Sequence, residues 1–133
     1  MSKNTIKIAN CSGFYGDRLS AAKEMVDGGP IDVLTGDYLA ELTMAILYGQ
    51  KIQRGEKAGY VGTFLKQLKQ IASSCSEKNI KVVSNAGGLN PKSMAEEVKN
   101  ILDSEGLNLK VAYIDGDDFM DEFDELKKNG EEL

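Results

Sequence analysis

Histidine and tryptophan are absent from this 133-residue chain, and cysteine and proline occur only twice each. Without histidine, the chain cannot itself supply a serine–histidine–aspartate triad or the commonest transition-metal ligand. Cys11 and Cys75 lie far apart and form no metal-type pair, which argues against a zinc site and against a disulfide framework. Any general acid or base must therefore be Asp, Glu, Lys, Tyr or Cys.

A surplus of basic charge and long apolar runs are missing too. The formal net charge is −5 and no cluster of Lys and Arg stands out, so nucleic acid is excluded as an expected partner. No run approaches the roughly 18 apolar residues of a membrane span, and the N-terminus lacks a signal-peptide core. We expect a single α/β domain over residues 1–133, located in the cytoplasm, with no membrane partner.

Short apolar runs alternate with helical patterns along the chain. Strands are predicted at residues 5–9, 31–34, 80–83 and 109–114, and helices at about 17–27, 39–54, 64–72 and 91–106, followed by an acidic helix and tail at 118–133. This alternation is typical of βαβ units with right-handed crossovers. The sequence therefore predicts a three-layer, Rossmann-like parallel sheet of at least four strands.

Polar loops follow each of the four predicted strands. In an open parallel sheet, ligands bind beyond the carboxyl ends of the strands, so these loops are the candidate site. For substrate binding we select Asn10, Ser12, Gly13, Asp17, Arg18, Tyr38, Asn85, Gly87, Gly88 and Asn90, and for acid–base catalysis Asp37 and Asp115. Neither GxGxxG nor GxxxxGK[ST] occurs, so standard dinucleotide and P-loop sites are not indicated, and no cofactor is assigned.

The turn at Gly87 and Gly88 has two readings. The missing Cβ atoms could let an anion approach the backbone before a helix that starts at Asn90 and Pro91, in which case Gly88→Val should weaken binding more than folding. The glycines could equally serve only the turn. The polar, glycine-rich segment 55–62 is the best candidate for a mobile lid.

Other candidates also have structural alternatives. Asp17, Asp37 and Asp118 could cap helices, and Arg18 could bind an anionic ligand or pair with Asp37. Asp115, Asp117 and Asp118 could hold Mg²⁺, although a solvated acidic loop is favoured and no metal site is assigned. Cys11 could be a nucleophile, but an inert thiol is favoured.

Three long motifs occur in order: residues 8–18 (IANCSGFYGDR), 29–41 (GPIDVLTGDYLAE) and 85–91 (NAGGLNP). Together they resemble the N-terminal region of the acyclic terpene utilisation family AtuA, long described as a domain of unknown function. The resemblance implies the N-terminal part of a longer architecture. It further implies a metabolic role in terpenoid breakdown and a small anionic ligand such as an acyl-CoA.

Three functions remain open at this point. The leading hypothesis is a domain of a metabolic enzyme, a hydrolase or lyase, that acts on an acyl-CoA thioester or another anionic metabolite. The second is a non-catalytic ligand-binding or assembly domain, which leans on further chain or on a second copy as a homo-oligomer. The third is a small phosphate- or nucleotide-binding regulator.

Overall fold

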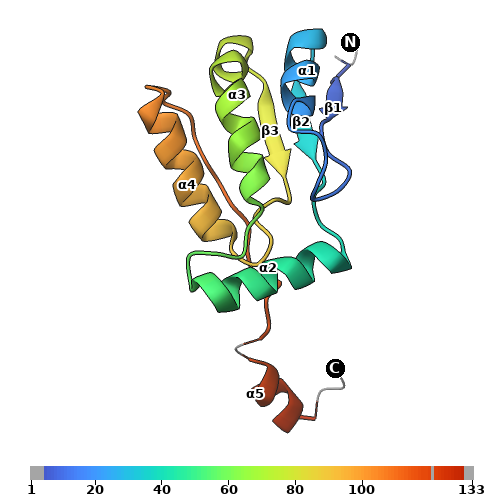
Figure 1. Ribbon diagram of the computed structural model, residues 1–133, viewed down its shortest axis with the longest axis vertical. Helices are drawn as coiled ribbons and strands as arrows, with labels where there is room; N and C mark the ends of the chain where they lie inside the picture. Colours follow the sequence, from blue (N-terminus) through green and yellow to red (C-terminus); the bar gives the residue numbers. More distant parts are fainter. Residues whose placement is uncertain (1–4, 121, 131–133) are drawn as a thin grey trace.

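Three short parallel strands form the sheet (Figure 1). They are β1 (Ile8–Asn10), β2 (Val33–Gly36) and β3 (Lys81–Ser84), in the order β1-β2-β3. Ile8 lies opposite Val33, which lies opposite Lys81 on the other side. The structure is a computed structural model that describes residues 5–120 and 122–130.

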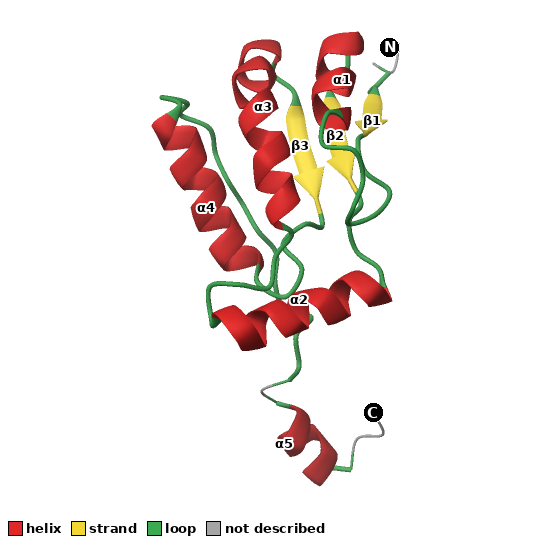
Figure 2. Ribbon diagram, in the orientation of Figure 1, coloured by secondary structure: helices red, strands yellow, loops and turns green. Residues whose placement is uncertain are grey.

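Helices link the strands, as expected (Figure 2). The crossover from β1 to β2 is α1 (Ala21–Gly28), and that from β2 to β3 contains α2 (Glu41–Arg54) and α3 (Gly62–Lys78). After β3 come α4 (Pro91–Ser104) and the short α5 (Phe123–Lys128). The prediction of an α/β fold with a parallel sheet and helical crossovers is confirmed.

The described helices cover only one face of the sheet. Each strand lies on the same side of the one before it, and right-handed crossovers that advance in one direction all pass over the same face. Accordingly α1, α3 and α4 stand side by side in one layer (Figure 1). On the opposite face, Ile8 is 65% exposed and Val83 is 59% exposed. The expected three-layer arrangement is therefore wrong for the described residues, which form two layers.

The core lies between this helical layer and the sheet. Leu34 of β2 is 1% exposed and packs in one cluster with Val26 of α1 and with Leu68 and Ile71 of α3. In α3, the buried side chains recur at helical spacing, and Asn79 ends the helix in the left-handed conformation with a φ of 54°. Sequence periodicity thus identified this helix correctly.

The predicted fourth strand at 109–114 is an extended segment without a sheet partner. No strand is assigned there, and among the described residues no backbone–backbone hydrogen bond involves residues 108–118. Leu109 and Val111 are nevertheless half-buried, whereas Lys110 and Ala112 are exposed. The alternation that suggested a strand is present, but the hydrogen-bonded ladder is not.

The segment before α3 is anchored rather than free to act as a lid. Val61 is fully buried and donates its amide to the Ala86 carbonyl at 2.8 Å, while Leu89 donates to the Gly59 carbonyl at 2.9 Å. Asn90 Nδ2 adds hydrogen bonds to the carbonyl oxygens of Glu56 and Ala58. These contacts contradict the lid hypothesis.

Helix α2 lies across the carboxyl ends of the strands (Figure 1). Only Thr43 and Leu47 are buried in it, while Leu42 is 73% exposed and Ile52 is 68% exposed. Of the described helices, none is long and apolar enough to cross a membrane.

Candidate functional site

Three strand-end loops meet at the carboxyl edge of the sheet. They follow Asn10, Gly36 and Ser84, the last residues of β1, β2 and β3. Because the strands are parallel and adjacent, their ends lie together. We call the loops that begin at Cys11, Asp37 and Asn85 the three-loop site. Convergence is confirmed for these loops, whereas the fourth predicted loop, at Asp115, follows no strand.

Hydrogen bonds lock the three loops to one another. The Asp37 amide donates to the Ser12 carbonyl at 3.0 Å, which joins the first two loops. The third is joined by Asn85, which accepts from the Tyr38 amide at 2.8 Å and donates through Nδ2 to Asp37 Oδ1 at 2.7 Å. Asn85 therefore holds both the backbone and the carboxylate of the second loop, and it fixes the direction of the exposed Asp37 side chain.

Asn10 and Ser12 shape the first loop. Asn10 Nδ2 donates to the Ser12 carbonyl at 2.9 Å, and Asn10 Oδ1 accepts from Thr35 Oγ1 at 3.1 Å. The Ser12 hydroxyl is buried and donates to the Phe14 carbonyl at 2.9 Å. Asn10 thus remains at the surface, whereas the hydroxyl of Ser12 serves the loop itself.

Asp17 closes the first loop from the other side. Its carboxylate accepts from the amides of Gly13 at 3.0 Å and of Arg18 at 2.7 Å, and these two hydrogen bonds hold the pKa of the carboxyl below its ordinary value. The helix consequently starts at Ala21 rather than at Asp17. Within the described part of the chain, the Arg18 guanidinium forms an exposed ion pair with Glu24 at 2.6 Å and none with Asp37.

The Gly87 and Gly88 turn is packed against protein. A Cβ atom on Gly87 would lie 2.8 Å from Pro91 Cα, and one on Gly88 would overlap Leu47 Cδ1 and lie 2.9 Å from the Gly59 carbonyl oxygen. Gly88 also has a φ of 53°. Asn90 caps α4 by accepting from the Ser93 amide at 3.1 Å, so the predicted cap followed by Pro91 is confirmed. This geometry favours the structural reading of the turn.

Tyr38 lies in the core rather than at the surface, with 2% of its area exposed. Its hydroxyl donates to Gln67 Oε1 and lies 3.9 Å from Cys11 Sγ, and its ring meets Phe64 edge to face at 6.0 Å. Burial raises the pKa of the Tyr38 phenol. The side chain positions the second loop and does not face a ligand.

Sequence reasoning missed Gln67. It is 2% exposed, and besides accepting from Tyr38 it donates through Nε2 to the Arg18 carbonyl at 3.2 Å. One α3 side chain therefore holds two loops of the site. An amide at helical spacing between Phe64 and Ile71, on an otherwise apolar face, was the signal that could have revealed it.

Both thiols should be inert in the folded protein. Burial raises the pKa of Cys11 and of Cys75, which are 6% and 4% exposed. We expect maleimide to label them at least about 100-fold more slowly than in the unfolded chain, because a buried thiol reacts only after opening. Mass spectrometry of timed reactions would measure this. If Cys11 in the folded protein were labelled quickly while Cys75 stayed protected, the hypothesis that Cys11 is a nucleophile would be supported.

The aspartates that follow the extended segment stand apart from the three-loop site. Asp115 is exposed. Among the described residues, Asp37 is hydrogen-bonded to Asn85, and no hydrogen bond joins it to Asp115. Asp118 forms an ion pair with Lys51 of α2 at 3.6 Å. Across the described residues, no group of three or more Cys, Asp or Glu side chains could hold a metal ion.

Two surface grooves lie away from the three-loop site. One is formed by α4 and the extended segment, and the other lies at the amino edge of the sheet between Asp27 and Ile80. The three-loop site itself is a surface of polar groups. Asn10, Asp37 and Asn85 are exposed there and have side chains that can bond a ligand.

Comparison with known proteins assigns a family. Residues 6–133 match the family described as acyclic terpene utilisation family protein AtuA. No significant match was found among curated proteins or solved structures. Since the match covers nearly all of the sequence, including each of the three loops, the chain belongs to the acyclic terpene utilisation family AtuA.

Proposed function

We propose that this chain is a metabolic domain that binds a small anionic metabolite at the three-loop site. The metabolite class is an acyl-CoA thioester or another phosphate-bearing compound of acyclic terpene utilisation. The family assignment supports the metabolic context. The observation that carries the proposal is the mutual locking of the loops by Asn85, Asp37 and Ser12, which pre-organises exposed polar groups on a rigid sheet edge.

The surroundings of the site suit an anion in two respects. Helix α2 starts just after the second loop, and its N-cap residue Ala40 provides no side-chain cap, so the positive end of the helix dipole is open there. No atom lies within 4 Å of the position a Cβ would take on Gly13, so a ligand can approach that side of the loop, although the Gly13 amide itself donates to Asp17 at 3.0 Å. Asn10 and Asn85 would orient the ligand. For Gly87 and Gly88, by contrast, we assign support of the site rather than contact.

Asp37 is the residue we propose for acid–base chemistry. Its carboxylate is exposed and held in direction by the Asn85 amide at 2.7 Å. With a bound thioester, it would act as acid or base in hydrolysis or in carbon–carbon lyase chemistry. Asp115, the other candidate, lies outside the three-loop site.

The test measures binding of CoA and of branched acyl-CoA thioesters by calorimetry. We expect Asn85→Ala to weaken binding about tenfold, since one hydrogen bond to a charged ligand and the direction of Asp37 are lost. Asn100→Ala, an exposed asparagine on α4, is the matched control and should bind like the parent protein. Asp37→Asn should preserve binding and abolish any turnover. Identical affinities for all variants, or no binding by the parent, would refute the proposal.

A non-catalytic assembly domain is the second candidate. It is favoured by the uncovered face of the sheet, where Ile8 and Val83 are 65% and 59% exposed, together with Ile6 just before β1, which is 67% exposed. Isolated apolar side chains are common on protein surfaces, but a group on one sheet face marks a contact surface. Turnover by the isolated chain would argue for the enzyme.

A further inference from the structure

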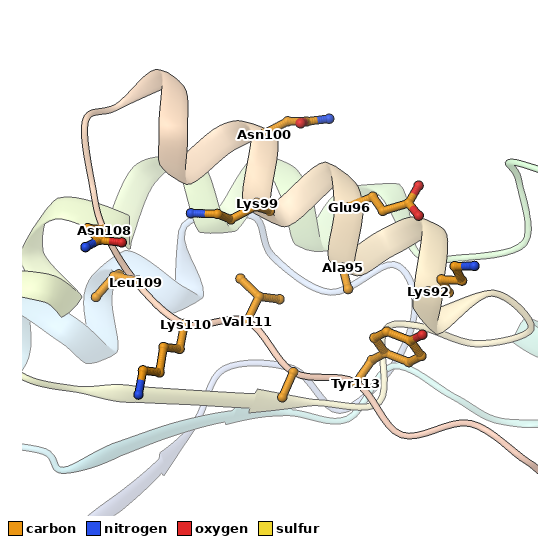
Figure 3. A pocket seen from close by; sticks show the side chains of 11 residues that line it. Lys92, Ala95, Glu96, Lys99, Asn100, Asn108, Leu109, Lys110, Val111 and Tyr113 are labelled. Atoms are coloured by element: carbon orange, nitrogen blue, oxygen red, sulfur yellow. The ribbon is translucent and has the colours of Figure 1, made fainter.

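A groove runs between α4 and the extended segment that follows it (Figure 3). It has a volume of about 760 Å³. One wall comes from α4 and the other from six consecutive residues, and the lining is Lys92, Ala95, Glu96, Lys99, Asn100 and residues 108–113. The second wall is therefore a continuous stretch of chain, residues 108–113. We call this feature the α4 groove.

Residues 108–113, which form one wall of the α4 groove, are suited to pair with an added strand. Among the described residues, no backbone–backbone hydrogen bond involves residues 108–118. The segment runs in the same direction as β3 (Figure 1). Its side chains alternate between half-buried and exposed, as in a strand. Unpaired N–H and C=O groups along an extended segment are the groups that an incoming strand bonds when it adds to a backbone edge.

Charge and lining define which strand fits. Lys92, Lys99 and Lys110 surround the α4 groove, against Glu96 alone, in a chain whose net charge is −5. Lys99 is paired with Asp103 at 2.6 Å, whereas within the described part of the chain neither Lys92 nor Lys110 takes part in an ion pair. Ala95, Leu109, Val111 and Ala112 make the rest of the lining mostly apolar. The groove therefore suits an acidic segment with apolar anchors.

The chain carries such a segment itself. Residues 115–128, which we call the acidic arm, include Asp115, Asp117, Asp118, Glu122, Asp124 and Glu125. Three of its apolar side chains are exposed, namely Phe119 at 57%, Met120 at 61% and Phe123 at 40%, and Leu126 is half-buried. In Figure 1 the arm leads away from the sheet past α2, and its one described ion pair with the rest of the chain joins Asp118 to Lys51.

We propose that the acidic arm of one copy of this chain docks in the α4 groove of a second copy, reciprocally, to form a dimer with twofold symmetry. The part of the arm that precedes α5 would add to residues 108–113 as a strand, with its carboxylates near Lys92 and Lys110 and its apolar side chains against Ala95 and Val111. The arm begins right after the groove wall and leads away from it, so its own groove is reached only by a sharp reversal, whereas a partner's groove is not. The three-loop site takes no part, so the interface and the ligand proposal can fail separately.

Cysteine cross-linking between copies tests the proposal directly. Ala95→Cys and Phe119→Cys are made in separate proteins with distinguishable tags, mixed and oxidised, so that only contacts between copies are read. We expect an abundant disulfide-linked product that joins the two tags. Replacing Ala95→Cys by Lys69→Cys, on the exposed side of α3, gives the matched control, and its yield should be at least about tenfold lower. Equal yields from the two pairs would overturn the proposal.

Charge reversal supplies an independent test by light scattering. Lys92→Glu and Lys110→Glu combined should weaken the dimer about tenfold or more, since the attraction of both lysines for the carboxylates of the arm becomes repulsion. The control reverses the exposed Lys57, Lys66 and Lys69 and should leave the dimer intact. Mixing the groove-reversed protein with Asp117→Lys and Glu122→Lys arms should restore association. A monomer at every concentration, or a dimer indifferent to groove reversal, would refute the proposal.

Discussion

Replacing Gly88 with valine is expected to destabilise the fold by about 3 to 5 kcal/mol, enough to unfold much of the protein. Gly88 has a φ of 53°, a conformation that a β-branched residue adopts only with strain. Its new Cβ would also overlap Leu47 Cδ1 and lie 2.9 Å from the Gly59 carbonyl oxygen. Chemical denaturation gives the free energy of unfolding.

The matched control is Gly62→Val, at the start of α3, where no atom lies within 4 Å of the new Cβ and φ is not positive. It should cost less than about 1 kcal/mol. Gly88→Ala should lie between the two. A Gly88→Val protein that keeps its stability but loses ligand affinity would restore the sequence-based hypothesis that this turn approaches an anion.

The difference between these two readings of Gly88 shows what the sequence can and cannot reveal. Asn90 followed by Pro91 predicts the start of α4, because helix capping depends only on residues a few positions apart in the sequence. The partners of Gly88 are Leu47 and Gly59, which belong to distant segments. The sequence of a glycine pair is the same whether a bound ligand or a neighbouring helix occupies the space that a side chain would take.

The predictions of three layers and of a fourth strand were wrong for the same kind of reason. Burial in α3 repeats every three to four residues, so its inner face could be read from the sequence. Strand order has no local signature, and only the order β1-β2-β3 places all crossovers on one face. That order also lacks the reversal at which open sheets usually bind ligands, so the candidate site depends on the interlocked loops instead. Residues 109–114 alternate like a strand, yet a strand also needs a partner.

For the site residues, too, the sequence predicted the location but not the individual contacts. That Asn10, Asp37 and Asn85 would gather followed from parallel strands alone, and the structure brings them together. That Asp17 would bond the amides of its own loop, or that Tyr38 would turn inward, depends on contacts among several segments. The sequence therefore placed these strand-end residues at one edge as a group, while their individual contacts required the structure.

Gln67→Ala is the second substitution with a large expected effect. The change leaves the Tyr38 hydroxyl and the Arg18 carbonyl without their partner and opens space in the core. We expect a loss of about 3 kcal/mol or more, since two polar groups become unsatisfied in a buried position. Because Gln67 holds the first and second loops, ligand affinity at the three-loop site should fall as well, and calorimetry on the same variant would measure it.

Gln70→Ala, an exposed glutamine on the same helix, controls for the loss of side-chain length and should change stability by less than about 0.5 kcal/mol. Tyr38→Phe removes one of the two Gln67 hydrogen bonds and should cost about 1 to 2 kcal/mol. The double variant Tyr38→Phe and Gln67→Ala should lose less than the sum of the single losses, because both changes break the same bond. Strict additivity, or a Gln67→Ala protein as stable as the Gln70→Ala control, would mean that α3 does not hold these loops through Gln67. The geometry of the site would then depend on its other hydrogen bonds, such as those of Asn85, Ser12 and Asp17.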